Sequence, residues 1–354
     1  MSLTAFQQQL LWICVKVGFA LFFGMNTAGL LAWMERKQSA VMQDRIGANR
    51  AAIFGFAALG LFNQIADAIK ALTKEDWVPP KGDRVLHALA PCLSMGFALF
   101  CLSALPFGGV VEVGGKLWSL QPIESTMGLP LILCFLSLGV HGIVMAGYAS
   151  GSNYGLLGGL RGAAQMISYE VCLAVTLAGC AFVYGTLDLQ QAVVWQGRLL
   201  GGWLPGWGIF LQPLAFVLFL TAGAAVTKRA PFDIPEGESE VVGYFVEYGG
   251  MKFLMFLITD FVESIVIAGL ITTLFLGGWQ VPFVTLTGWV GGVIMVLAFT
   301  FKIQLVLILL MQIRWTLPRF RFDQVLDLGW KNILPLSMLN FLVTVWGVLL
   351  WRSR

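Results

Sequence analysis

Long apolar segments recur along this chain and limit it to one class of fold. Eight of them hold about 20 mostly apolar residues each, the length that an α-helix needs to cross the hydrocarbon core of a bilayer. They are 10–33, 85–106, 127–148, 163–184, 209–227, 253–275, 289–311 and 333–351. With 58% hydrophobic and only 12% charged residues, the chain carries about half the charge density of a soluble domain. We therefore predict an all-α membrane protein with about eight transmembrane helices, forming a single polytopic domain over residues 1–354.

Basic residues are concentrated in the loops that follow alternate apolar segments. The loops 34–84, 228–252 and 312–332 hold most of the lysines and arginines, and loops rich in these residues remain on the cytoplasmic side of a membrane. We predict that these loops are cytoplasmic, that both termini are periplasmic, and that the chain lies among the lipids of the cell inner membrane. The net charge of +3 is too small to indicate nucleic-acid binding. The first residues lack the positive region of a signal peptide, so we expect them to begin the mature chain.

The first cytoplasmic loop contains an amphipathic segment. Asn63, Gln64, Asp67 and Lys70 follow one another at spacings that place them on one stripe of a helix, with apolar residues opposite. A helix of this kind lies flat in the membrane interface. The alternatives are a ninth span or a segment that enters the membrane and returns to the same side.

Ionisable residues inside the apolar segments are the first candidates for chemistry, because each costs about 2.5–3.5 kcal/mol to insert. Glu170 lies in the fourth segment, Asp260 and Glu263 in the sixth, and Lys302 in the seventh. Asp260 and Glu263 share one helical face, so we expect at least one of them to be neutral at pH 7 and able to pass protons. For Glu170 and Asp260 a proton path is favoured over a structural hydrogen bond or ion pair. For Glu263 both interpretations stay open. Lys302 could pair with a carboxylate or tune its neighbours by changing its own charge, and these two interpretations also stay open.

The loop after the fifth segment is the densest group of acidic residues. Its carboxylates are Asp233, Glu236, Glu238, Glu240 and Glu247. A solvated acidic loop is the usual interpretation of such a run. Here, however, two prolines stiffen the segment, apolar and aromatic residues are interspersed with the acids, and the loop leads directly into the segment that holds Asp260. We therefore predict a functional site.

Redox metals are not expected on this chain. The six cysteines are scattered through apolar segments without a Cys-x-x-Cys pair, and His87 and His141 are far apart in the sequence. Zinc and iron–sulfur sites need several such ligands close together. We predict no metal site in this chain, so electrons for any redox reaction must come from a partner.

Seven motifs occur along the chain in the order found in one family. They begin with Glu35-Arg36-Lys37 and Gln-Asp-Arg-Ile-Gly-Ala-Asn-Arg at 43–50, and they include Arg-Ala-Pro-Phe-Asp-Ile-Pro-Glu-Gly-Glu at 229–238 and Arg-Trp-Thr-Leu-Pro-Arg-Phe-Arg-Phe-Asp-Gln at 314–324. Taken alone, the charges at 35–50 suit an anionic lipid surface, a docked partner or the polar head of an amphiphile. Together, the motifs resemble those of the quinone-chamber membrane subunit (NuoH type) of NADH-quinone oxidoreductase, which is respiratory complex I.

The resemblance implies that the chain is one membrane subunit of a proton-translocating enzyme and is not catalytic alone. Members of this family join the membrane arm to the other complex I subunits and close a cavity that takes up quinone, the substrate. Electrons arrive from an iron–sulfur cluster in a neighbouring subunit. By the matching motifs, the residues expected to border the quinone cavity are Arg36, Arg45, Asp67 and Arg314. By the same motifs, the expected proton relay consists of Glu170, Glu236, Glu238, Glu240 and Glu247. Asp260 of the sixth apolar segment, discussed above, is added to this relay.

The sequence departs from the family pattern at several positions. Lys37 stands where a second arginine is usual, which removes a fork-shaped donor. Phe245 replaces the expected histidine, so that position offers no imidazole. In the sixth segment the usual Glu-Tyr is Asp260-Phe261, with Glu263 one turn further. These differences bear on the geometry of the relay more than on the overall role.

Two other functions are the alternatives. The membrane subunit of an energy-converting hydrogenase or formate hydrogenlyase is related to this family but uses no quinone, and the complete arginine-rich motifs favour the quinone enzyme. An ion-coupled transporter working alone would suit the buried Asp260, Glu263 and Lys302, yet it would leave the acid-rich loop 228–252 without a purpose.

Overall fold

The structure, a computed structural model, describes residues 5–352 except 53–54, 56–57, 114–115, 201–203, 236, 238–240, 242 and 283–287. Within these described residues, seven helical segments are long and apolar enough to cross a membrane, which confirms the predicted fold class. They are α1 (Ala5–Met42), α3 (Arg84–Ser103), α4 (Gly128–Ala149), α5 (Asn153–Tyr184), α9 (Gly250–Phe275), α10 (Gly288–Thr316) and a continuous segment of α11 (Phe322–Asp327), the π-helical turn η3 (Leu328–Ile333) and α12 (Leu334–Arg352).

The helices extend beyond several apolar segments into the predicted loops 34–84 and 312–332. α1 continues to Met42, inside the predicted loop 34–84. Much of the predicted loop 312–332 is helical, because it holds the end of α10, all of α11 and most of η3. Helical hydrogen bonding does not require apolar side chains, which is why hydropathy alone places the ends of these helices too early.

The fifth predicted span, 209–227, is interrupted. It consists of α7 (Gly208–Leu211) and α8 (Pro213–Val226), separated at Gln212. The first residue of α8 is a proline, which has no N–H to continue the hydrogen bonds of α7. The 14 residues of α8 rise about 21 Å, less than the hydrocarbon core of about 30 Å.

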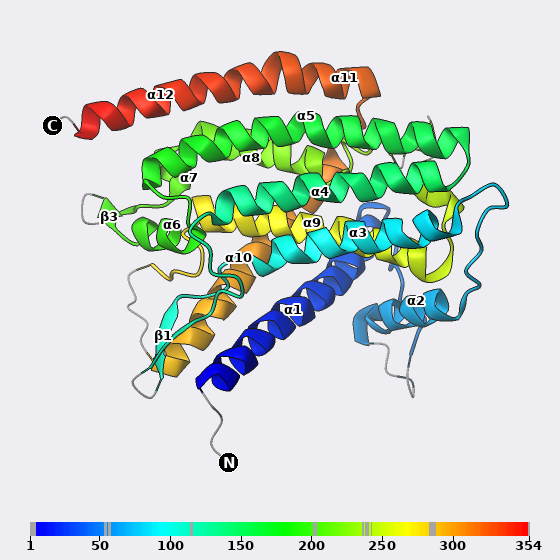
Figure 1. Cartoon of the computed structure of the whole chain (residues 1–354), viewed down its shortest axis with the longest axis horizontal. Helices are drawn as coiled ribbons and strands as arrows, with labels where there is room; N and C mark the ends of the chain where they lie inside the picture. The colour runs from blue at the N-terminus through cyan, green and yellow to red at the C-terminus, as the bar shows by residue number, and fades with distance from the viewer. Residues whose placement is uncertain are drawn as a thin grey trace.

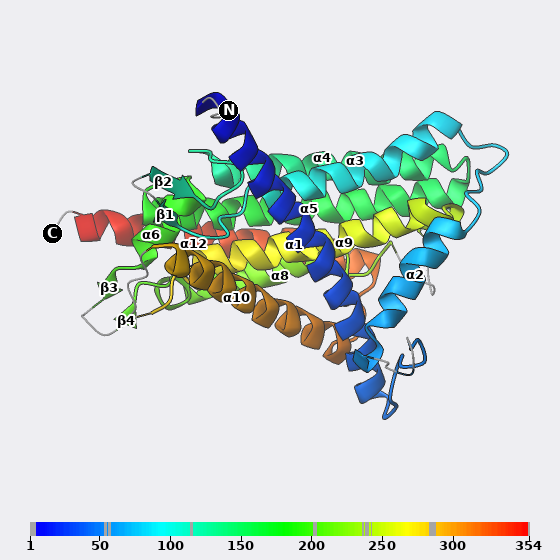
Figure 2. The same ribbon diagram turned by 90° about the horizontal axis from the view of Figure 1, so that it is seen from below.

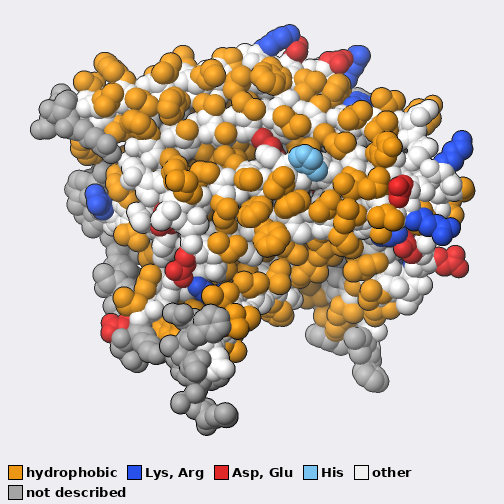
Figure 3. All heavy atoms as spheres, in the orientation of Figure 1, with side chains coloured by type: hydrophobic (Ala, Val, Ile, Leu, Met, Phe, Trp, Pro, Cys, Tyr) orange, Lys and Arg blue, Asp and Glu red, His pale blue; other side chains and the backbone are white. Residues whose placement is uncertain are grey.

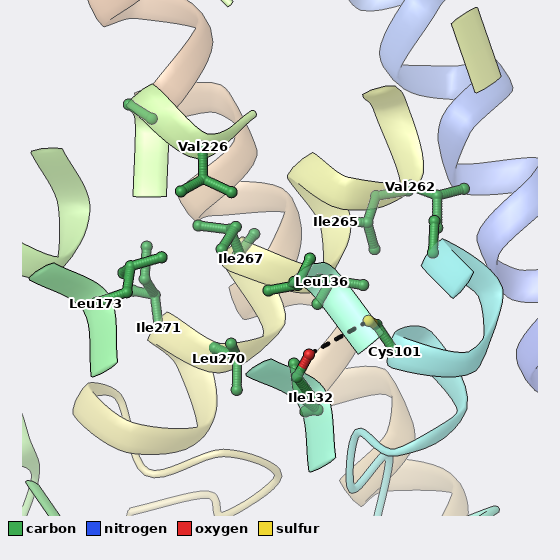
Figure 4. Packing of buried hydrophobic residues seen from close by; sticks show 14 of the residues in the cluster. Cys101, Ile132, Leu136, Leu173, Val226, Val262, Ile265, Ile267, Leu270 and Ile271 are labelled. Carbon is green, nitrogen blue, oxygen red and sulfur yellow. Dashed lines mark hydrogen bonds between the residues drawn. The ribbon is translucent and has the colours of Figure 1, made fainter. Parts of the chain in front are cut away.

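α9 is the central helix of the bundle. In its most apolar stretch 72% of the residues are buried, against 17% in the last span. Figure 1 shows α12, α5, α4 and α3 as neighbours in a row, with α9 running behind them. In Figure 4, Ile265 and Leu270 of α9 lie among side chains of neighbouring helices such as Leu136 and Leu173. Every residue from Thr259 to Phe275 of α9 is buried, so the polar groups in this part of the helix are enclosed by the rest of the bundle.

α2 (Phe62–Thr73) is a separate short helix that lies against α9 and the end of α1, as Figure 2 shows. Its 12 residues rise about 18 Å, too little for a span. Ile65, Ile69 and Leu72 are exposed, and this fully described helix buries none of its residues. The amphipathic helix is thereby confirmed and a ninth span is wrong, while the position of α2 in the membrane interface stays a prediction.

Two small hairpins and three short helices complete the described chain. β1 (Val110–Val113) pairs antiparallel with β2 (Lys116–Ser119), and β3 (Leu199–Leu200) pairs antiparallel with β4 (Leu204–Pro205). The short helices are η1 (Ala58–Gly60), α6 (Leu189–Gln196) and η2 (Tyr244–Glu247). Of these, η2 matters most for the site, because it lies in the connection between α8 and α9.

Hydrophobic side chains cover most of the face of the molecule seen in Figure 3, and charged side chains gather mainly toward the end where α2 lies. A soluble monomer rarely exposes so large an apolar area. The surface therefore fits a protein that is surrounded by lipid and other apolar helices. The assignment of loops and termini to the two sides of the membrane stays a prediction.

Candidate functional site

A lysine and two carboxylates form an ionic cluster inside the bundle. Lys228 Nζ lies 2.7 Å from Asp260 Oδ1 and 3.4 Å from Glu263 Oε2. The side chains of Lys228 and Glu263 are each 3% exposed and that of Asp260 is 12% exposed. We call these three residues the Lys228 triad. Asp260 and Glu263 lie one turn apart on α9. Lys228 reaches them from the second position after the end of α8 at Val226.

The electrostatics of the Lys228 triad keep the amine charged. Burial alone would lower the pKa of Lys228, but Asp260 and Glu263 outweigh burial and raise the pKa of Lys228 well above its ordinary value. One permanent positive charge therefore faces two carboxyl groups. When both are ionised, the triad carries one uncompensated negative charge in a site with little water.

Glu170 is buried on α5, beside the same set of helices. Ser137 Oγ of α4 donates a hydrogen bond to Glu170 Oε2 at 2.7 Å, and the other carboxyl oxygen is buried without a hydrogen-bond partner. α4 also faces the triad, because a Cβ atom at Gly139 would lie 3.9 Å from Glu263 Oε1. The structure thus brings Glu170, Asp260 and Glu263 into one group of packed helices, and a buried carboxyl group with an unused oxygen is suited to exchange protons.

A second ionic cluster joins three elements near the end of α1. Glu35 of α1 pairs with Arg229 through Oε2 at 2.7 Å and with Arg314 of α10 through Oε1. The guanidinium of Arg229 also lies 4.0 Å from the ring centroid of Phe261 on α9, a cation–π contact. We call Glu35, Arg229 and Arg314 the Glu35 cluster. It holds α1, α10 and the start of the loop after α8 together, next to the triad.

A cavity of about 30 Å³ lies beside the Glu35 cluster, lined in part by Arg229, Arg314, Ser264 and Leu31. This volume holds a water-sized molecule. The predicted cavity residue Arg314 therefore does line an internal space, although the space in the isolated chain is small.

The other predicted cavity residues lie toward α2. Arg36 Nη1 is 2.5 Å from Asp67 Oδ2, a pair that joins α1 to α2, and both side chains are partly exposed. Arg45 is exposed and donates from Nε to Gln43 Oε1 at 2.7 Å. Arg36 and Asp67 are thus brought together, whereas Arg45 does not contact either of them through a described hydrogen bond or ion pair.

Glu236, Glu238 and Glu240 of the predicted relay lie outside the described residues. The residues just before them are anchored to the bundle. Gln165 Nε2 of α5 donates to Ala225 O at 2.6 Å and to Phe232 O at 2.7 Å. After them, the backbone at Gly243 packs so closely on α5 that a Cβ at Gly158 would lie 3.0 Å from it, a contact that needs a small residue.

Glu247 is half-buried at the end of η2. Next to it lies a series of polar contacts between His87, Lys252 and Asp76 that sequence reasoning missed. His87 Nε2 lies 3.3 Å from Glu247 O, and His87 Nδ1 lies 3.2 Å from Lys252 Nζ, which in turn lies 2.9 Å from Asp76 Oδ2. Since an ammonium only donates, this geometry makes Nδ1 the acceptor and the imidazole neutral. The ring stacks on Tyr248 at 3.9 Å, and burial raises the pKa of Tyr248 above its ordinary range.

Lys302 of α10 has a different environment. Its amine donates to three backbone carbonyls in the turn that follows α9, those of Leu276 (2.8 Å), Gly278 (2.9 Å) and Gln280 (2.7 Å), and it lies 4.8 Å from the ring centroid of Trp207. It forms no ion pair with a carboxylate among the described residues. Among the described residues, pairing with an acid is therefore wrong, and Lys302 holds the turn that follows α9. A role in which the charge of Lys302 tunes its neighbours stays a prediction.

Comparison with known proteins identifies the family. A family model described as NADH dehydrogenase matches residues 14–345. The H subunit of NADH-quinone oxidoreductase from Thermomicrobium roseum is 41% identical over 349 residues, which cover 96% of this chain and 98% of the relative. The chain belongs to the family of NADH-quinone oxidoreductase H subunits. The H subunit of Protochlamydia amoebophila is 39% identical over 325 residues, with 92% and 94% of the two chains covered. An H subunit of Geobacter sulfurreducens is 40% identical over 332 residues, with 94% of each covered.

Membership of this family makes the chain a multi-pass membrane subunit of NADH-quinone oxidoreductase, which works together with the other subunits of that complex. The resemblance drawn from the motifs is therefore confirmed over a hydrogenase or a solitary transporter. No group of three His, Cys, Asp or Glu side chains in the described part of the chain is arranged to hold a metal ion.

Lys228 and Glu35 are among the site residues that the sequence alone did not reveal. Both occur in charged motifs that are typical of an ordinary cytoplasmic loop. The only feature that could have indicated Lys228 is its place in the chain, directly after an apolar segment and beside the acid-rich loop. Glu35 gave no comparable signal, because its partners are 194 and 279 residues away.

Proposed function

We propose that this membrane subunit forms part of the quinone-binding cavity of the complex and transmits the charge change of quinone reduction to buried acidic residues that move protons. The observation that carries the proposal is the Lys228 triad, in which two carboxyl groups of the central helix α9 share one cation, the Lys228 amine, inside the bundle. Ionisable groups enclosed by spans are costly and are retained where they serve ion or proton pathways.

The proposed cavity border consists of Arg36, Arg45, Asp67 and Arg314. Arg36 and Asp67 connect α1 to α2, and α2 offers exposed apolar side chains such as Ile65 and Ile69. An isoprenoid tail needs an apolar path and a quinone head needs hydrogen-bond donors, so the combination suits this substrate. The remainder of the cavity would come from the hydrophilic subunits of the complex.

The chemistry couples a charge to a proton. Reduction of a quinone to a quinol takes up two electrons and two protons, so negative charge develops at the head before protons arrive. In a site of low dielectric constant that charge acts strongly on nearby groups. The Glu35 cluster adjoins both the cavity lined by Arg314 and the Lys228 triad. It is the proposed electrostatic link between the cavity and the triad.

The proposed relay contains Glu170, Asp260 and Glu247, together with Glu236, Glu238 and Glu240 of the loop. The triad adds Glu263 to this set. Glu170 has the unused buried oxygen that a proton acceptor needs. The loop acids are proposed on the basis of their position in the chain, between anchored segments that lie against α5.

The test is replacement of single acids in membranes that contain the assembled complex. Glu170→Gln and Glu240→Gln should assemble, keep NADH oxidation by a water-soluble acceptor that bypasses quinone, and lose most NADH:quinone turnover together with proton translocation. Arg45→Gln should raise the quinone concentration needed for half-maximal turnover. Glu124→Gln is the matched control, because that carboxylate is exposed beside Lys16. Unchanged coupled turnover in both acid variants would refute the relay.

A further inference from the structure

Lys228 occupies its place under strain. Its φ angle is +54°, in the left-handed region that side chains other than glycine rarely adopt. Such conformations persist where the surroundings impose them, and they concentrate at functional sites. Here the strained backbone directs a 3% exposed amine to two carboxyl groups at 2.7 and 3.4 Å. A lysine that only marked the cytoplasmic end of a span would extend toward water instead.

The charges of the triad can be counted state by state. With Asp260 and Glu263 both ionised, the sum is −1; with one of them protonated, it is zero. A buried site disfavours net charge, so the neutral state with one proton is the resting one. Asp260 lies nearer to the amine, which assigns the ionised form to Asp260 and the proton to Glu263.

Other titratable groups face the triad from each side. Tyr244 of η2 acts electrostatically on Lys228, and Glu170 of α5 acts on Glu263. Cys101 of α3 is close enough to be affected by Glu263 and Glu170. Among these, only Glu170 is a carboxylate that could receive a proton from Glu263 near neutral pH.

We propose that Lys228 is a positioning residue that limits the acid pair to one exchangeable proton, because its single charge balances one carboxylate and leaves the other to carry the proton. The inference rests on the proposed function and adds a residue to it. In the transfer step the O–H bond of Glu263 breaks, the proton passes to the Glu170 carboxylate, and Glu263 is left ionised until a proton from the loop side replaces it.

This arrangement predicts that a second substitution, at Lys228, restores part of the turnover that is lost when one acid of the triad is replaced. In Glu263→Gln or Asp260→Asn, Lys228 pairs with the one remaining carboxylate and keeps it ionised, so no exchangeable proton is left. We expect quinone turnover per assembled complex to fall at least about tenfold, since a nearby opposite charge shifts a carboxyl titration by about 1–3 pH units. Adding Lys228→Met to either variant releases the remaining acid to bind a proton, and turnover should recover severalfold above the single variant.

The controls separate this role from a structural one. Lys228→Met combined with Glu170→Gln should stay at the level of Glu170→Gln alone, and Lys228→Arg should retain turnover. Lys228→Met alone should move the pH profile of turnover to higher pH, because the acid pair then holds its protons longer. If Lys228→Met does not assemble, Lys228→Gln serves in the same combinations.

Double variants no more active than the single ones, in complexes whose NADH oxidation by the artificial acceptor is normal, would overturn the inference. If Glu170→Gln keeps coupled turnover, the proposal that Glu170 is part of a proton relay is refuted, and the inference about Lys228 is refuted with it. Loss of activity in Glu170→Gln without any suppression by Lys228→Met would remove only the assignment of Lys228.

Discussion

Two lysines bind at different places along α9, and the partners of these lysines differ. Near the middle of α9, the buried Lys228 lies between Asp260 and Glu263. In the turn after the helix, the amine of the half-buried Lys302 is bound by the backbone carbonyls of Leu276, Gly278 and Gln280. Both amines are withdrawn from water, yet only the first has partners that can gain or lose a proton.

The difference shows how to sort ionisable residues inside a membrane. The backbone carbonyls of a turn also need hydrogen-bond donors when they are withdrawn from water, so a lysine that binds them completes the fold. A lysine shared by two acids leaves a choice of protonation states, which a reaction can use. The identity of the partner, and not burial as such, separates structure from chemistry.

The largest expected effect comes from removing both acids of the triad. Asp260→Asn with Glu263→Gln leaves the Lys228 charge buried without a counter-ion, and breaking a buried pair in this way costs about 3–5 kcal/mol. We expect little assembled complex in membranes and a clearly lower unfolding temperature of what is purified. The triple variant that also carries Lys228→Met is the control, because neutral residues of similar size restore stability without restoring turnover. An unfolding temperature equal to that of the parent complex in the double variant would contradict the ionic description of the triad.

The next effect concerns Lys302→Met. Three carbonyl groups in the turn after α9 lose their donor, and each unsatisfied buried group costs about 1–3 kcal/mol before water or local shifts relieve it. The free energy of unfolding should therefore fall by about 2–3 kcal/mol. Turnover and proton translocation per assembled complex should stay normal, unlike in Glu263→Gln. If Lys302→Met assembles fully but loses coupled turnover, the contrast between Lys228 and Lys302 is wrong.

The fold could be predicted from the sequence to the extent that it is local. Apolar length predicts the spans, and the polar stripe from Asn63 to Lys70 predicts α2, because both depend on near neighbours in the chain. The interruption at Gln212 was missed because a total count of apolar residues does not register a single proline. The buried acids Glu170, Asp260 and Glu263 can be predicted from the sequence in the same way as the spans, because a charged residue within an apolar run is recognised from its near neighbours in the chain.

The ionic partners could not be predicted, since they are set by packing between distant segments. Glu35 meets Arg229 and Arg314 only after α1, α9 and α10 have packed, and each of these residues looks like a cytoplasmic loop charge in the sequence. The site of His87 is similar: an isolated histidine in an apolar segment gives no hint that it stacks on Tyr248. Side-chain pairing across hundreds of residues has no periodic signature.

The smallest expected effect on stability tests a pair at the edge of the molecule. The Arg36 and Asp67 side chains are 47% and 36% exposed, and pairs in such positions contribute about 0–1 kcal/mol because water and salt screen them. Arg36→Gln and Asp67→Asn should therefore leave the unfolding temperature of the complex almost unchanged. If these residues border the quinone cavity, the same variants should raise the quinone concentration for half-maximal turnover, with NADH oxidation by the artificial acceptor unaffected. Lys331→Gln, which removes a more exposed pair with Asp327 away from α2, is the control and should change neither quantity. A similar response in the control would mean that surface charge in general, and not this position, governs access of the quinone.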